Sequence, residues 1–194
     1  MKVIQKSLLA LASTVFLAGS VFGADEFKAF PIFTDENFDP NIEVALVGGH
    51  MNPSNKDLKS AMMYGLEVSL DCPVFTLPGE NLLRQQFSVN RYSKNSVDIT
   101  TIEINPYYFI NLSESFFVGF GPGIGGAHVD VDGGETTWMF TYQVGAGVKY
   151  YFNDDVFAGL DLRQQWSVEK DYLQSGEKED VENFRAMAKV GYRF

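Results

Sequence analysis

Residues 185–194, with the sequence RAMAKVGYRF, alternate between two kinds of side chain. Every even-numbered position from Ala186 to Phe194 is apolar, whereas the odd-numbered positions are mostly charged or small. A period of two is that of a β-strand, because successive side chains point to opposite faces of the strand. This stretch therefore predicts a strand with one apolar face and one polar face.

The same alternation recurs along the chain, and no segment keeps a helical period over three turns. Runs of about 9–13 residues are long enough to cross a bilayer as tilted strands. Such strands must close on themselves, because lipid offers no hydrogen-bond partner to a free sheet edge. The pattern predicts an all-β protein, an eight-stranded antiparallel up-and-down transmembrane β-barrel. The eight predicted strands are Ile42–His50, Met62–Leu70, Leu82–Tyr92, Val97–Phe109, Phe116–His128, Trp138–Phe152, Val156–Val168 and Asp180–Phe194. A soluble barrel with its apolar face inside is the alternative.

The N-terminus has the features of a secretory signal peptide. Lys2 and Lys6 form a short basic region, and Leu8–Phe22 is apolar apart from small or hydroxyl residues. We expect residues 1–23 to be removed before Ala24. Residues 24–41 would then be an N-terminal periplasmic segment, and residues 42–194 the barrel domain.

Charge and composition exclude several classes of protein. Without Lys2 and Lys6 the net charge falls from −10 to −12, which argues against a nucleic-acid partner. No second apolar stretch of about 20 residues exists, so a helical membrane protein is excluded. Cys72 is the only cysteine and has Asp71 beside it, which favours an incidental thiol over a reactive one.

The connections between the predicted strands differ between the two ends of the barrel. With the first strand starting in the periplasm, the set with long, acidic, glycine-rich members should be extracellular and the generally tighter set periplasmic. The extracellular set is Met51–Ala61, Ser93–Ser96, Val129–Thr137 and Glu169–Glu179. The periplasmic set is Asp71–Asn81, Ile110–Ser115 and Asn153–Asp155.

Aromatic residues gather near the ends of the predicted strands. Aromatic girdles at the two membrane interfaces are typical of transmembrane barrels. The predicted girdle residues are Tyr107, Tyr108, Phe116, Phe117, Trp138, Tyr150, Tyr151, Phe152, Tyr192 and Phe194.

Two segments resemble a known family. Residues 106–109 (PYYF) followed by 119–123 (GFGPG), and residues 144–155 (VGAGVKYYFNDD) followed by 159–163 (GLDLR), resemble the small outer-membrane β-barrels that include OmpA-type membrane domains and OmpX-like adhesins. The resemblance implies a monomer in the outer membrane of a Gram-negative bacterium, surrounded by lipid and lipopolysaccharide. It also implies recognition of the closing strand by the barrel-assembly machinery, through Val190, Tyr192 and Phe194.

Charged side chains of both signs are predicted to face the lumen. An eight-stranded barrel is narrow enough for side chains to fill it, and buried charges need partners. The predicted lumen network comprises Glu43, Glu67, Arg84, Glu103, Lys149, Asp161, Arg163, Arg185 and Lys189. Two interpretations remain open, a salt-bridged interior that rigidifies the barrel and a narrow gated pore.

Two other motifs point to chemistry only weakly. Asp130, Asp132 and Glu135 are spaced as carboxylate ligands for calcium, but the rest of a calcium-loop pattern is missing, and a solvated hairpin tip is favoured. Residues 121–126 (GPGIGG) match the dinucleotide-binding pattern without the helix that it requires. Those glycines are better explained as space for lumen side chains, with Pro122 marking a bulge. No metal or cofactor is predicted.

Catalysis is not predicted either. His50 and His128 are the only histidines, and neither is followed by a serine at the spacing expected of a serine–histidine pair. We therefore predict a non-enzymatic protein with a structural and surface-interaction role. The charge-rich segment Glu169–Asp180 is the candidate contact with a host or surface ligand. A narrow porin-like passive channel for small solutes is the alternative.

Overall fold

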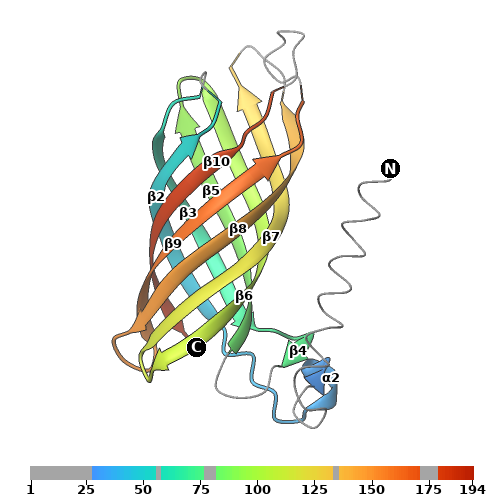
Figure 1. The fold of residues 1–194 in the computed structure, drawn as a ribbon, viewed down its shortest axis with the longest axis vertical. Coiled ribbons are helices and arrows are strands. Elements are labelled where there is room, and N and C mark those ends of the chain that lie inside the picture. The colour runs from blue at the N-terminus through green and yellow to red at the C-terminus, as the bar shows by residue number, and fades with distance from the viewer. Residues whose placement is uncertain (1–27, 56–57, 77–81, 133–135, 171–178) are drawn as a thin grey trace.

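The computed structural model describes residues 28–55, 58–76, 82–132, 136–170 and 179–194. Eight antiparallel strands form a closed barrel in the order β10-β2-β3-β5-β6-β7-β8-β9 (Figure 1). The strands are β2 (Glu43–Pro53), β3 (Ala61–Asp71), β5 (Leu82–Lys94), β6 (Val97–Ser113), β7 (Phe116–Val131), β8 (Thr137–Tyr151), β9 (Val156–Ser167) and β10 (Asn183–Arg193). The predicted all-β barrel of eight antiparallel strands is confirmed.

The last strand closes the barrel against the first. β10 pairs with β2 along its whole length, from Asn183 opposite Pro53 to Arg193 opposite Glu43. It pairs with β9 on its other side. Every barrel strand therefore has a neighbour on both sides, which leaves no open sheet edge.

The strand bounds differ by up to four residues from the prediction, and two of the differences concern β6 and β7. β6 continues to Ser113, past its predicted end, because it keeps pairing with β7 across a register shift between Asn111 and Ser113. The bulge predicted at Pro122 is not where the shift occurs. The pairs Ile104–Ile124 and Tyr108–Phe120 share one register, which places Pro106 opposite Pro122. Neither proline can donate a ladder hydrogen bond, so the ladder is interrupted there without an inserted residue.

The outer surface of the barrel is an apolar band. Along each strand, exposed large apolar side chains alternate with buried ones, as Val44 and Leu46 do on β2 and Phe140, Tyr142 and Val144 on β8. A continuous apolar exterior around a closed sheet is what a hydrocarbon environment requires. The fold is thus that of a transmembrane β-barrel.

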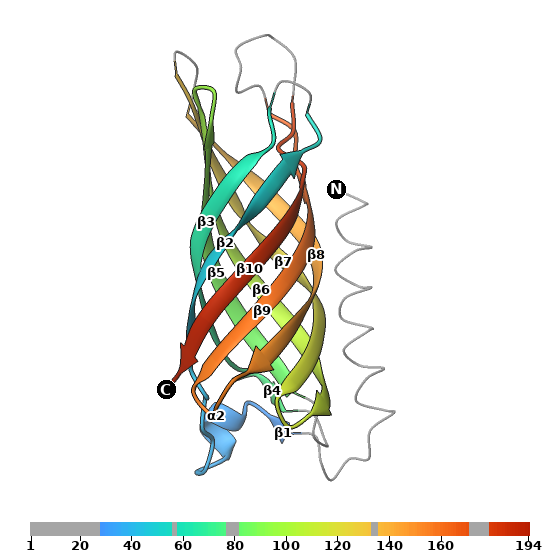
Figure 2. The same cartoon turned by 90° about the vertical axis from the view of Figure 1, so that its left-hand side faces the viewer.

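The two ends of the barrel differ. We call the end that holds the C-terminus and the connections 114–115, 152–155 and 72–81 the turn end (Figures 1 and 2). The loop end holds the connections 54–60, 95–96, 132–136 and 168–182. The link at residues 95–96 is a two-residue hairpin turn in which Asn95 and Ser96 both have positive φ, 50° and 63°.

A short N-terminal segment packs at the turn end. β1 (Lys28–Ala29) pairs with β4 (Phe75–Thr76), and helix α2 (Pro31–Thr34) follows β1. No helix in the described part of the chain has the length and apolar character needed to cross a membrane. The predicted signal peptide, residues 1–23, lies outside the described residues, as does the start of the predicted segment 24–41.

Candidate functional site

The lumen is filled by side chains in three layers stacked along the barrel axis. A central layer is charged, a layer toward the loop end is apolar, and a layer toward the turn end mixes charged and aromatic groups. All nine residues of the predicted lumen network are buried inside the barrel.

Arg163 is at the centre of the charged layer. One nitrogen of its guanidinium, Nη2, lies 2.8 Å from Glu67 Oε2 and 3.3 Å from Asp161 Oδ2, and Nη1 lies 3.2 Å from Glu103 Oε2. Lys189 Nζ bridges the same Glu67 and Asp161 at 2.9 and 2.8 Å. These contacts join carboxylates from three strands to one cation.

Arg185 completes the central layer by pairing with Glu103, with Nη1 2.7 Å from Oε1. The layer therefore contains three acidic and three basic side chains and has no net charge. Buried charges are tolerated when they are paired in this way, because an unpaired charge loses its hydration without compensation.

Glycines on β8 make room for this layer. A Cβ built on Gly145 would lie 2.0 Å from Tyr107 Oη, and one on Gly147 would lie 1.8 Å from Asp161 Oδ1. Within the predicted glycine run, Gly123 leaves room for the side chain of Asn105 in the same manner, whereas Gly121 and Gly125 face backbone carbonyls of β6. The glycines are thus positions of close approach inside a packed interior.

The layer at the turn end is organised around Glu43. Its carboxylate accepts hydrogen bonds from Lys149 Nζ at 2.5 Å, Ser69 Oγ at 2.8 Å and the Tyr151 hydroxyl. Arg84 Nη2 lies 3.5 Å from Glu43 Oε2. The three remaining residues of the predicted network, Glu43, Arg84 and Lys149, thus meet here and not in the central layer.

Two charged residues of this layer were not predicted. Asp71 accepts a hydrogen bond from Arg84 Nη1 at 2.8 Å, and Arg193 Nε lies 3.5 Å from Glu43 Oε1. Asp71 is predicted to begin the connection Asp71–Asn81, but it is the last residue of β3. Arg193 has the same parity as Arg185 and Lys189, so the alternation itself was a signal for its inward position.

Part of the predicted aromatic girdle is wrong. Tyr107 and Tyr151 are buried inside the barrel, and Phe117 packs edge-on against Tyr151. The physical reason is the period of two, which turns Tyr151 inward between its exposed neighbours Tyr150 and Phe152. The other girdle residues with exposed side chains are Trp138, Tyr192 and Phe194.

Inward-facing aromatic rings instead lie against two cations of the turn-end layer, the buried Lys149 and the half-buried Arg193. Lys149 Nζ lies 4.6 Å from the centroid of the Phe157 ring and 4.9 Å from that of Phe109. The guanidinium of Arg193 lies 4.0 Å from the centroid of Tyr151. Cation–π contacts of this kind stabilise charges that have left water.

The layer toward the loop end is apolar, which corrects the prediction that inward positions form a polar half. Leu58 and Val181, from two connections at the loop end, pack onto inward-facing residues of the barrel wall. Tyr92 donates a hydrogen bond from its hydroxyl to the carbonyl of Lys59, which holds one of these connections against the wall. The wall residues are Val47, Met51, Met63, Tyr92, Val97, Ile99, Ala127, Val129, Met139 and Met187.

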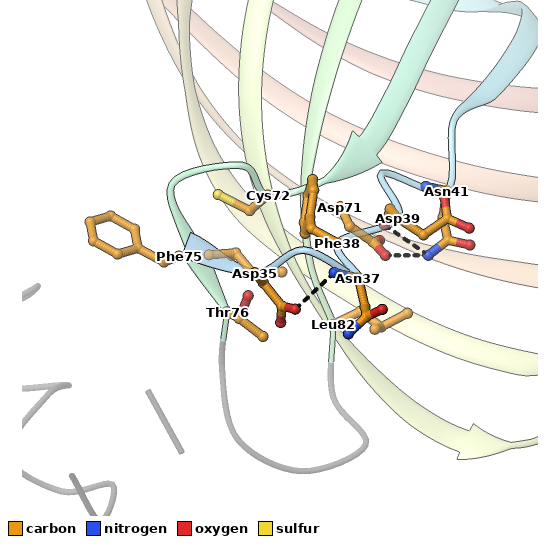
Figure 3. Close-up of a pocket in the computed structure, with 11 residues that line it drawn as sticks. Asp35, Asn37, Phe38, Asp39, Asn41, Asp71, Cys72, Phe75, Thr76 and Leu82 are labelled. Atoms are coloured by element: carbon orange, nitrogen blue, oxygen red, sulfur yellow. Dashed lines mark hydrogen bonds between the residues drawn. The ribbon is translucent and has the colours of Figure 1, made fainter. Parts of the chain in front are cut away.

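A pocket of about 340 Å³ lies at the turn end, between the N-terminal segment and the barrel (Figure 3). Its carboxylates are engaged in local contacts. Asp35 and Asp39 accept hydrogen bonds from the backbone N–H groups of Asn37 and Asn41, at 3.1 and 3.0 Å. The Asn41 side chain also donates to Asp71 at 2.6 Å. The pocket is therefore the seam by which the N-terminal segment is attached.

The remaining predicted residues lie on the outside. Val190, Tyr192 and Phe194 are exposed at the turn end of β10, with the Tyr192 and Phe194 rings in edge contact. Asp130 and Asp132 are exposed at the loop end, and Glu135 lies outside the described residues. Among the described residues, no three or more His, Cys, Asp or Glu side chains come together as a metal site.

Solved structures that are similar to this barrel include small outer-membrane barrels. Neisserial surface protein A superimposes with a TM-score of 0.53 and 18% identity, over 79% of this chain and 97% of that one. Ail, the attachment invasion locus protein of Yersinia pestis, gives 0.50 and 15%, over 79% and 96%. No protein-family model and no curated protein sequence matches the chain. The resemblance predicted from the sequence is confirmed at the level of the fold.

Proposed function

We propose that this chain is a non-enzymatic barrel of the outer membrane of a Gram-negative bacterium, with a closed lumen and an acidic loop end that contacts partners at the cell surface. The observation that carries the proposal is the packing of the lumen. Six central charges are paired with one another, and apolar side chains together with Leu58 and Val181 cover them on the loop side. An interior filled in this way favours a rigid scaffold over a narrow passive channel.

The loop end supplies the second part of the proposal, because its described residues carry an excess of acidic side chains. Within its described residues the acidic side chains outnumber the basic ones, Lys59, Arg91, Lys94 and Lys170. The acidic side chains are Asp98, Asp130, Asp132, Glu169, Glu179, Asp180 and Glu182. Such a surface steers and holds a partner with a basic surface through complementary charge.

The similar structures agree with a role at the surface. One is named a surface protein and the other an attachment invasion locus protein. In this proposal the loop end faces the cell exterior, and the turn end, with Phe194, faces the periplasm and the barrel-assembly machinery. Outer-membrane lipid and lipopolysaccharide surround the apolar band of a monomeric barrel.

Two further features support a non-enzymatic role. Within the described residues, neither His50 nor His128 has a hydroxyl group as a hydrogen-bond partner. The His128 ring packs against the Trp138 ring, with 4.9 Å between the ring centroids. Lipid A mass spectra of cells with and without the protein should be identical. A new or missing acyl chain in those spectra would instead assign an enzymatic activity.

Conductance measurements test the closed lumen. The mature protein, refolded and inserted into planar bilayers, should give no discrete current steps. Steady single-channel steps that change when Arg163 or Arg185 is neutralised would favour the channel and overturn the scaffold.

Adhesion measurements test the loop end. Cells that display the protein should bind surfaces coated with a basic protein, and replacing Glu169–Asp180 by a short Gly/Asn turn should reduce this binding. The control replaces Asp154 and Asp155 at the turn end by Asn. Equal binding by all three proteins would leave only the structural role.

A further inference from the structure

Three neighbouring apolar side chains at the turn end are exposed. Phe30, Ile32 and Phe33 have exposed fractions of 52%, 50% and 84%. The segment 30–34 that carries them contains no charged residue. Pro31 is the only buried residue of α2, so these three side chains contribute little to the packing of the chain itself. A contiguous apolar patch of this kind usually marks a contact with another surface.

The patch is held in place at both ends. On its N-terminal side, β1 pairs with β4, and the Phe30 N–H donates to the Val74 carbonyl at 2.7 Å. On its C-terminal side, the Asp71 N–H donates to the Pro40 carbonyl at 2.8 Å. These contacts fix α2 to the barrel, so the exposed apolar residues keep one position relative to the membrane-spanning wall.

The backbone at Phe30 is in an unfavourable conformation. Its φ and ψ are both 54°, the left-handed region, which an aromatic residue rarely adopts. The carbonyl of Phe30 nevertheless accepts hydrogen bonds from the Phe33 N–H and the Thr34 hydroxyl, at 2.9 and 3.1 Å. This turn presents Phe30 and Phe33 to the outside at a cost in backbone strain.

The position of α2 identifies the surface that it contacts. Figure 1 shows α2 at the lower end of the barrel and to one side of it, next to β4, and Figure 2 shows it just below the C-terminus. The apolar band of the barrel ends at this same end of the molecule, where Leu112, Phe152 and Phe194 are exposed. The patch on α2 therefore lies at the same end as the rim of the lipid-facing band.

We propose that Phe30, Ile32 and Phe33 insert into the headgroup–acyl boundary of the leaflet at the turn end. The segment 28–41 is then a peripheral membrane contact that belongs to the barrel. Short apolar and aromatic segments bind in this way when a polar side remains in water, and here Asp35 and Glu36 follow the patch directly. The inference rests on the proposed membrane location, and it assigns the patch to a lipid surface.

Site-specific fluorescent labels test this contact. Phe33→Cys and, as a matched control, Glu36→Cys are made in a Cys72→Ser background, labelled with an environment-sensitive fluorophore, and refolded into phosphatidylcholine vesicles. A third label at Val144→Cys reports the lipid-facing wall. We expect blue-shifted emission, quenching by lipids that carry shallow nitroxides, and protection from aqueous iodide at position 33. At position 36 we expect quenching by iodide.

Equal iodide quenching at positions 33 and 36 would overturn the inference. If the label at position 144 is then still quenched by nitroxide lipids, the barrel spans the membrane and only the contact of α2 is wrong. If the label at position 144 is also exposed to water, the membrane location itself fails. Disulfide crosslinking between two Phe33→Cys chains at high dilution in lipid would assign the patch to a second copy and would likewise overturn the lipid contact.

Discussion

Arg163 on β9 pairs with Glu67 on β3 at 2.8 Å, although β10 and β2 separate these two strands in the barrel. The ion pair therefore joins parts of the wall that share no backbone hydrogen bonds. Because the same guanidinium also reaches Glu103 on β6, one side chain links three distant strands. We conclude that the interior adds cross-barrel connections to the hydrogen bonds of the sheet.

Replacing this side chain should strongly destabilise the barrel. Arg163→Met leaves Glu67, Glu103 and Asp161 with fewer positive partners in a buried site, and loss of one partner from a buried ion pair costs about 3–5 kcal/mol. Equilibrium urea unfolding of the refolded protein in micelles, followed by tryptophan fluorescence, measures the change.

The control for this variant is an ion pair on the surface. Arg91 Nη2 and Asp98 Oδ2 are also 2.8 Å apart, but both side chains are substantially exposed. Arg91→Gln should cost no more than about 1 kcal/mol. Equal losses for the two variants would show that burial of the Arg163 network is unimportant for stability.

A double-mutant cycle on Arg185 and Glu103 should reveal strong coupling. Both side chains are fully buried, with 2.7 Å between Arg185 Nη1 and Glu103 Oε1. Each single change to Met leaves one buried charge short of a partner, whereas the double change removes both charges. The double variant should therefore lose less stability than the sum of the single variants, by about 0.5–3 kcal/mol. Additive losses in the same urea titration would contradict the pairing.

The fold could be predicted from the sequence because apolar and polar residues alternate with a period of two along the strands of the barrel wall. Positions such as Phe140 and Val144 on one face and Thr141 and Gln143 on the other leave few alternatives to a strand. The same parity predicted that Arg163 and Lys189 point into the lumen. The division of the lumen charges into a central layer and a turn-end layer depends on the register across several strands, which no single strand encodes.

The apolar layer at the loop end could not be predicted from the alternation of the strands. Met63 and Met139 have the parity of residues that face the lumen. The prediction that inward-facing side chains are polar does not account for these two apolar residues. Their environment is created by Leu58 and Val181, which arrive from connections far apart in sequence. The prediction that Tyr151 belongs to the outer aromatic girdle was wrong for a related reason. Aromatic residues at strand ends occur on either face of the barrel wall.

Adding a methyl group inside the barrel should be costly at Gly145. Its Cβ would lie 2.0 Å from the hydroxyl of Tyr107, a buried and rigid side chain that has little room to move. Gly145→Ala should destabilise the protein by about 1–3 kcal/mol through overpacking. Gly48 is the matched control, because a Cβ there meets nothing within 4 Å. Gly48→Ala should be neutral or stabilising, and a ranking in the opposite order would contradict the close packing of β8.

Truncating a methionine at the loop end should reduce stability more when its side chain faces the lumen than when it lies on the outer face. Met139 is 1% exposed inside the lumen, and Met62 is 68% exposed on the outer face at the same end. Met139→Ala should cost about 2–5 kcal/mol because it leaves a cavity among packed neighbours. Met62→Ala should cost far less. Thermal unfolding of the two variants, read from the shift between folded and unfolded bands on gels, compares them directly.

The acidic loop end should lose affinity for a basic partner as the pH falls. Burial, together with the carboxylates of Asp180 and Glu169, raises the pKa of Glu182 above its ordinary value of 4.5. Glu182 therefore takes up a proton at a higher pH than an isolated glutamate. Binding of polylysine to cells that display the protein should weaken as the pH is lowered from 7 toward 4, at constant ionic strength.

The Glu182→Gln variant separates the protonation of Glu182 from the other effects of low pH on the protein. A carboxyl group with a raised pKa favours the folded state below its ordinary pKa, and this contribution is lost as the pH rises through the folded-state pKa. Glu182→Gln should therefore gain stability relative to the wild type at pH 7 and lose that advantage below about pH 4. For the wild type, part of the decrease in polylysine binding should occur at the higher pH values, where Glu182 takes up its proton. This part of the decrease should be absent in Glu182→Gln. Glu114→Gln, at the turn end, should reproduce the wild-type binding profile, and a changed profile for Glu114→Gln would place the acidic contact at the wrong end of the barrel.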